Sequence, residues 1–224
     1  MKKAFMLFAL LVFLVAAYAV EVVIGTGTSY TTYSGYPAVY GGYYMNAREQ
    51  YLVTAAEFAA NGGGAGNITT LGFNVYGVNA CGPLPNFTIR MGHSALSALP
   101  TTFVTGLTQV YNNANYQPVV GWNSHVLDTP FAWDGSSNVV VEVSFDMQTA
   151  YTENTSTYYT STSPNYMAVF YRNDTVAWNT IATGTQSYNR PNMKFDMAAG
   201  GAVAPFPAVL VSPSDGASYV GLDA

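Results

Sequence analysis

Histidine is the side chain best suited to acid–base and metal chemistry near neutral pH, and the sequence contains two, His93 and His125. Neither lies at a metal-ligand spacing from another histidine or from a cysteine. A Ser–His–Asp triad can be written on paper from His125, Asp128 and any serine, but no nucleophile-elbow glycine pattern marks one serine out. We therefore interpret both histidines as polar residues at strand ends or on the surface, and we expect a protein that is not an enzyme.

Carboxylates are the second group that could do chemistry, since glycoside hydrolases need two of them about 5 to 9.5 Å apart. The best pair by strand periodicity is Glu142 with Asp146, but four residues of strand span about 13 Å. We interpret both as solubilising charges on an exposed face. A structural calcium site using Asp134, Asp146 or Asp174 with loop carbonyls is an open alternative, although no EF-hand spacing supports it. We otherwise expect no cofactor.

The single cysteine, Cys81, is the remaining reactive side chain. It has no partner in the chain for an internal disulfide, so a packed core must supply the stability that small secreted domains often take from disulfides. We expect Cys81 to be buried and inert.

Aromatic rings are the best candidate for a binding element, because the chain has 18 tyrosines. Residues 29–44 form a stretch rich in Tyr, Gly, Ser and Thr, which predicts an extended loop or an irregular edge strand. An exposed tyrosine combines an apolar ring face with a polar hydroxyl, and so suits stacking on a glycan or on another surface protein. The candidate ligand-binding residues are Tyr40, Tyr43, Tyr44, Tyr158 and Tyr159. The alternative is that these rings cover sheet edges and the core.

The elements that must position these residues are predicted to be strands. Phe, Tyr, Val and Thr are abundant, and apolar residues alternate with small or polar ones in several short runs. The clearest runs are 71–75, 86–91, 121–127, 138–145 and 193–197. Turn-forming sequences such as Asp134-Gly135 separate them. This pattern predicts an all-β fold, an antiparallel β-sandwich of jelly-roll-like form.

Residues 51–60 (YLVTAAEFAA) are ambiguous between helix and strand. Their Ala, Leu and Glu residues favour a helix. Leu52, Thr54, Ala56 and Phe58 would share one face of a strand, and we predict a strand here.

The N-terminus has the pattern of a secretory signal peptide. Lys2-Lys3 forms a basic start, residues 4–15 are an unbroken apolar run, and Ala17-Tyr18-Ala19 supplies small residues where a signal peptidase cuts. The run is shorter than the roughly 20 apolar residues of a membrane span. We predict a signal-peptide helix over 1–19, cleaved after Ala19. The protein is then expected to be secreted or held at the cell surface, without membrane insertion once the leader is removed.

Charge excludes two classes of partner. Beyond the leader the chain keeps its 12 acidic residues but few basic ones. The basic residues that remain are Arg48, Arg90, Arg172, Arg190 and Lys194. Nucleic acid and anionic lipid both need clustered Lys and Arg, so neither is an expected partner.

The composition changes near the C-terminus. We assign residues 20–197 to the β-sandwich and residues 198–207, rich in small residues and proline, to a linker. Residues 208–224 contain a strand pattern, a Pro-Ser-Asp-Gly turn and the approach to a second strand. An isolated hairpin is marginal in water. We therefore interpret 208–224 as the start of a truncated fibronectin type III-like or Ig-like domain.

Several of these segments together carry a resemblance to a known class of module. They are 24–28, 50–57, 66–75, 86–93, 107–111, 121–122, 127–135, 138–143 and 189–195. The sequence resembles a jelly-roll-like β-sandwich module found in large secreted multidomain proteins of Bacteroidota-type bacteria. The resemblance implies a fold and following fibronectin type III-like or Ig-like repeats, but it implies no catalytic residues.

The sequence therefore predicts a non-enzymatic, exported β-sandwich module of a larger bacterial cell-surface or secreted protein. Its expected role is adhesion, ligand or glycan binding, or the spacing of other domains. The alternative is an accessory domain of a secreted hydrolase whose catalytic part lies beyond residue 224.

Overall fold

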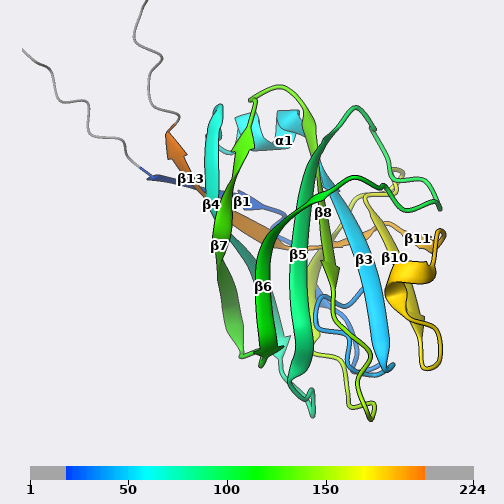
Figure 1. The fold of residues 1–224 in the computed structure, drawn as a ribbon. Coiled ribbons are helices and arrows are strands. Elements are labelled where there is room, and N and C mark those ends of the chain that lie inside the picture. The colour runs from blue at the N-terminus through cyan, green and yellow to red at the C-terminus, as the bar shows by residue number, and fades with distance from the viewer. Residues whose placement is uncertain (1–18, 200–224) are drawn as a thin grey trace, which may run out of the picture.

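The computed structural model describes residues 19–199, which form two antiparallel β-sheets packed together (Figure 1). It confirms the all-β sandwich predicted from the alternation of apolar residues. Each of the five predicted runs coincides with a strand, apart from Phe145, which follows the end of one. The predicted signal-peptide helix and residues 208–224 lie outside the described residues.

The first sheet has seven strands. Five follow one another in the order β1–β13–β4–β9–β12, while β7 also pairs with β4 and β2 with β9. Their bounds are β1 Ala19–Ile24, β2 Ser29–Tyr30, β4 Gly66–Gly77, β7 Gly121–Trp133, β9 Ser156–Ser161, β12 Asn189–Pro191 and β13 Met193–Ala199. The predicted cleavage point, Ala19, is the first residue of β1, and it pairs with Ala198. Because β13 continues to Ala199, the first two residues of the predicted linker belong to the sheet.

The second sheet has six strands in the order β11–β10–β3–β8–β5–β6. Their bounds are β3 Asn46–Val53, β5 Leu84–Ser94, β6 Thr108–Tyr116, β8 Asn138–Ser144, β10 Ala168–Asn173 and β11 Thr185–Ser187. A short 3-10 helix, η1 (Trp178–Thr180), lies near β10 and β3.

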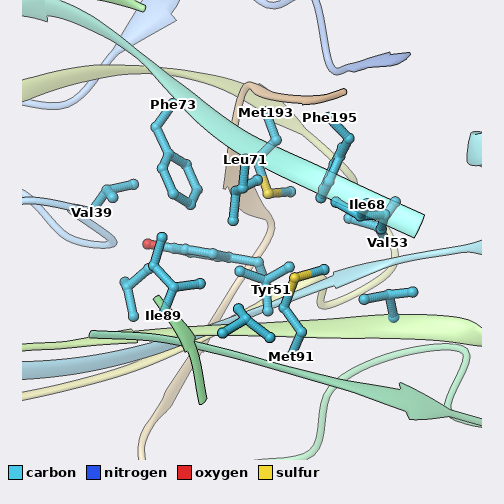
Figure 2. Packing of buried hydrophobic residues seen from close by; sticks show 14 of the residues in the cluster. Val39, Tyr51, Val53, Ile68, Leu71, Phe73, Ile89, Met91, Met193 and Phe195 are labelled. Carbon is cyan, nitrogen blue, oxygen red and sulfur yellow. The ribbon is translucent and has the colours of Figure 1, made fainter. Parts of the chain in front are cut away.

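The main core lies between the sheets, and Figure 2 shows its two halves facing each other. Leu71, Phe73, Met193 and Phe195 come from the seven-stranded sheet, and Tyr51, Val53, Ile89 and Met91 come from the six-stranded sheet. Each of these side chains is fully buried. Burial of one large apolar side chain contributes about 1.5–3 kcal/mol, so this core supplies the stability that no disulfide provides.

A second apolar cluster covers the other face of the six-stranded sheet. Leu52 and Val140 alternate with core residues on β3 and β8, and therefore point away from the main core. Leu99 and Phe103 from the segment after β5 pack on them. The prediction that Glu142 lies on an exposed face is wrong, because this segment and η1 cover that face and leave Glu142 only 1% exposed.

The prediction of one strand over residues 51–60 is also wrong in its second half. β3 ends at Val53, and α1 (Ala55–Ala60) follows. Thr54 caps this helix, accepting a hydrogen bond from the Glu57 N–H while the Glu57 carboxylate accepts one from the Thr54 N–H. This capping box favours a helix where alternation alone had favoured a strand.

Among the helices of residues 19–199, none has the length and apolar character needed to cross a bilayer.

Candidate functional site

An aromatic groove lies on the outer face of the seven-stranded sheet. We define it by the rings of Tyr30, Tyr76, Trp122 and Tyr158, beside the segment Gly25–Thr28. Tyr30, Tyr76 and Trp122 remain 46%, 47% and 36% exposed. The groove has a volume of about 490 Å³, within the range of ligand sites. Exposed rings grouped in this way make the groove a candidate interaction site.

The strand registers bring these rings together. Leu71, Phe73 and Val75 of β4 point into the core, so Tyr76 and Asn74 point outward. Trp122 on β7 pairs directly with Asn74. Residues widely separated in sequence thus form one row across the sheet.

Gly72 on β4 lies beside the side chains of Trp122 and Lys194. A Cβ on Gly72 would come 3.5 Å from the Trp122 ring and 3.1 Å from the Lys194 side chain. The 3.5 Å distance is an ordinary contact, whereas 3.1 Å is tight, so the lack of a Cβ mainly lets the Lys194 side chain lie close to the backbone of Gly72. The Lys194 ammonium lies 5.4 Å from the centre of the Trp122 ring, within range of a cation–π interaction.

Three tyrosines form the opposite part of the groove. The Tyr30 and Tyr76 rings stack with centroids 3.9 Å apart and planes inclined by 11°. Tyr158 meets both edge-on, at 6.2 Å from Tyr30 and 5.5 Å from Tyr76. The Tyr76 hydroxyl raises the pKa of Tyr30 by hydrogen bonding and charge repulsion, so Tyr30 is a neutral phenol at neutral pH. These contacts hold the rings in place before any ligand arrives.

Polar bonds fix the rim of the groove. Asn192 donates from Nδ2 to the Gly27 carbonyl oxygen at 2.7 Å and accepts from the Thr160 hydroxyl at 2.8 Å. The Thr160 hydroxyl oxygen accepts from the Gly27 N–H at 2.8 Å. Gly27 passes so close to the Tyr159 carbonyl that a Cβ there would clash with it. The rim is therefore rigid backbone, while the Asn74 side chain makes no hydrogen bond with residues 19–199 and can serve a ligand.

The five predicted binding tyrosines do not form one platform. Tyr158 lines the groove, but Tyr159 is the next residue on β9 and points to the opposite face. Tyr43 and Tyr44 lie elsewhere, with ring centroids 5.5 Å apart and beside Asp174.

Tyr40 is fully buried, so the prediction that it displays its ring to a ligand is wrong. Its ring packs on Phe87 and Tyr116, and its hydroxyl is 2.8 Å from His125 Nε2. A turn in residues 29–44 brings this ring back into the core, which composition could not predict.

His125 is likewise buried, contrary to the prediction of a strand-end or surface position. Burial lowers its pKa to about 3, so the ring is neutral. His125 points into the core and Asp128 is exposed on the other face of β7, which excludes the triad written from these residues. His93 is exposed, and its Nε2 lies 3.9 Å from an Asp134 carboxylate oxygen.

Asp134 and Asp146, each a possible ligand in the calcium alternative, lie beyond opposite ends of β8. Asp134 precedes β8 and Asp146 follows it, so the length of a seven-residue strand separates them. Asp134 accepts from Ser136 and Ser137, Asp146 from Asn86, and Asp174 from the Met45 N–H. Within residues 19–199, no three acidic, histidine or cysteine side chains are grouped as a metal site would require.

Sequence reasoning missed Tyr76 and Trp122. Both lie within or beside runs predicted as strands, and alternation with Leu71 and Val75 already placed Tyr76 on the outer face. Alternation along each strand could therefore predict that each ring separately points outward. The row they form depends on the pairing of β4 with β7 and β9.

Comparison of the chain with protein-family models, with curated proteins and with solved structures finds no match. The resemblance to secreted bacterial modules therefore stays a prediction.

Proposed function

We propose that this chain is a non-enzymatic carbohydrate-binding module of an exported protein, and that the aromatic groove holds a neutral sugar chain. The observation that carries the proposal is the set of exposed rings, held in fixed positions on the outer face of a sheet. A pyranose ring has a face of C–H groups that stacks on an aromatic ring and an edge of hydroxyls that needs polar partners. The groove offers rings for the face and the Asn74 amide for the edge.

The charges around the groove favour a neutral ligand. Lys194, whose ammonium lies by the Trp122 ring, is 2.9 Å from the Glu21 carboxylate, so the pair adds no net charge. The groove is open to solvent, and an open groove accepts the interior of a chain as well as its end. This supports binding to a polymer.

A module of this kind serves adhesion in a cell-surface protein, and it serves equally as the accessory domain of a secreted hydrolase. Both roles need the groove, and neither needs catalysis within residues 19–199. We also propose that the chain is related to the β-sandwich modules of large secreted proteins of Bacteroidota-type bacteria.

The test is a glycan array followed by calorimetric titration of the neutral oligosaccharide that binds best. Trp122→Ala and Tyr76→Ala should each weaken binding about tenfold, the loss expected for one stacking partner worth about 1.4 kcal/mol. Tyr151→Ala is the matched control, since Tyr151 is 65% exposed and lies outside the groove. Binding of no glycan, or equal loss in the control, would overturn the proposal.

A further inference from the structure

Arg172 is the exception among the cations of residues 19–199. Each of the others forms an ion pair with a carboxylate: Arg48 and Arg90 with Glu142, Arg190 with Glu57, and Lys194 with Glu21, at 2.6–3.2 Å. The Arg172 guanidinium makes neither an ion pair nor a hydrogen bond with any described residue. Arg172 is exposed, so its guanidinium is open to a ligand from solvent.

Aromatic rings hold this guanidinium in place. Its Cζ lies 5.0 Å from the ring centre of Tyr36, 5.2 Å from Tyr44 and 5.3 Å from Phe170. Tyr36 stacks on Phe170 with centroids 5.7 Å apart, so the rings form a connected support. Cation–π contacts use the flat face of the guanidinium and leave its N–H donors free. The rings therefore orient the group, while its N–H donors stay hydrated and open to a ligand.

The free donors border an open pocket of about 400 Å³ at the edge of the six-stranded sheet. β11 pairs with β10 only from Ala168 to Phe170, and this short pairing leaves a notch beside Arg172. Thr183 and Thr185 are exposed on its far wall. A Cβ on Gly184 would lie 2.5 Å from the Phe170 carbonyl oxygen, so a glycine is needed for this wall to approach so closely.

We propose that Arg172, with Tyr44, Thr183 and Thr185, forms a second ligand site that binds the carboxylate of an acidic sugar. The guanidinium fork matches a planar carboxylate with two parallel hydrogen bonds. Thr183 and Thr185 line the same pocket, and their hydroxyls make no hydrogen bonds with described residues, so they are available to sugar hydroxyls. Tyr44 offers a ring to the sugar face.

A doubly charged phosphate fits this site less well. A second free cation would be needed to balance it, and residues 19–199 place none there. Two carboxylates nearby also repel a doubly charged anion more than a singly charged one. Glu49 is buried close enough to interact with the Arg172 charge, and Asp174 lines a neighbouring pocket that shares Tyr44. One negative charge on a hydroxylated ring is the better match.

The site is independent of the aromatic groove, since the two share no lining residue. The experiment is calorimetric titration of the full chain with uronic-acid trisaccharides (galacturonate, glucuronate and mannuronate) and with the methyl ester of each. Methylation removes the charge and keeps the sugar skeleton. Inorganic phosphate and sulfate form a separate arm.

We expect at least one uronate trisaccharide to bind and its methyl ester to bind about tenfold or more weakly. Arg172→Lys should weaken uronate binding about ten- to hundredfold, the loss of charge-assisted bonds. Lys194→Gln removes one positive charge elsewhere and Trp122→Ala impairs only the groove, so both should leave uronate binding unchanged. Thr183→Val with Thr185→Val should weaken it several-fold without touching the aromatic support, which keeps the test valid if Arg172 variants unfold.

Three outcomes would overturn the proposal. They are the absence of binding to every uronate, equal affinity for a uronate and its methyl ester, and equal losses in Arg172→Lys and Lys194→Gln. Phosphate or sulfate binding tighter than the uronates would show that the site takes free anions and would also overturn it.

Discussion

The substitution Glu49→Gln should make the protein more stable at pH 8 and change little at pH 4. Glu49 lies on β3, points into the core and is fully buried. It accepts hydrogen bonds from the Ala38 N–H at 2.7 Å and from the Tyr51 hydroxyl. Burial raises its pKa from 4.5 to about 7, and these bonds offset only part of the effect.

Because the pKa of Glu49 is raised on folding, its contribution to the free energy of unfolding falls as the pH rises. The folded state holds the proton of Glu49 more tightly than the unfolded state does, so Glu49 contributes most stability below pH 4.5. That contribution is lost as the pH rises from 4.5 through about 7. The difference in pKa corresponds to about 3 kcal/mol in the free energy of unfolding. Glutamine keeps an oxygen acceptor for Ala38 but never ionises, so the variant escapes this loss.

The assay is urea denaturation of both proteins from pH 4 to pH 8.5, read by far-UV circular dichroism. The stability of the variant minus that of the parent should rise by up to about 3 kcal/mol across this range. Other titrating groups, such as His125, contribute equally to the free energy of unfolding of both proteins, so their contributions cancel in the difference. Glu21→Gln is the control for removal of a carboxylate, because Glu21 is half exposed rather than buried. A flat profile for Glu49→Gln would refute the reasoning that burial governs this carboxyl.

Three further predictions follow from buried groups. His125 has its pKa lowered to about 3, so its contribution to stability is present above pH 6.5 and is lost as the pH falls toward 3; His125→Gln should flatten this acid limb in urea denaturation. Glu57→Gln keeps the helix cap but breaks the 2.6 Å ion pair with buried Arg190, and should lower the free energy of unfolding by about 2 kcal/mol, since Glu57 is partly exposed. Burial raises the pKa of Cys81 to about 11, so a thiol reagent at pH 8 should label it only after denaturant is added, and rapid labelling of the native protein would contradict its buried position.

The strands could be predicted because alternation is a local property. Val139, Val141 and Val143 share a face whatever the rest of the chain does, and all three lie in the main core. The same is true of Phe87, Ile89 and Met91. Burial of Cys81 was also predicted correctly, from its lack of a disulfide partner.

The exposure of polar and aromatic residues could not be predicted in this way. Alternation placed Glu142 on the face opposite the core, which is correct, but a segment more than 30 residues away in sequence covers that face. Tyr40 and Tyr43 are three residues apart in one loop, yet one is fully buried and the other 37% exposed. Both are tyrosines in the same Tyr- and Gly-rich stretch, and only the path of the loop makes their exposure differ.

The sequence by itself determined the fold class, the positions of the main strands and the faces that enter the core, because each depends on neighbours within one strand. The tertiary structure alone decided which rings meet. Tyr30, Tyr76, Trp122 and Tyr158 come from four strands and become a groove only through strand pairing. Arg172 likewise became a candidate site only when every other described cation was found to have a carboxylate partner, since ion pairing across strands is a property of the folded chain.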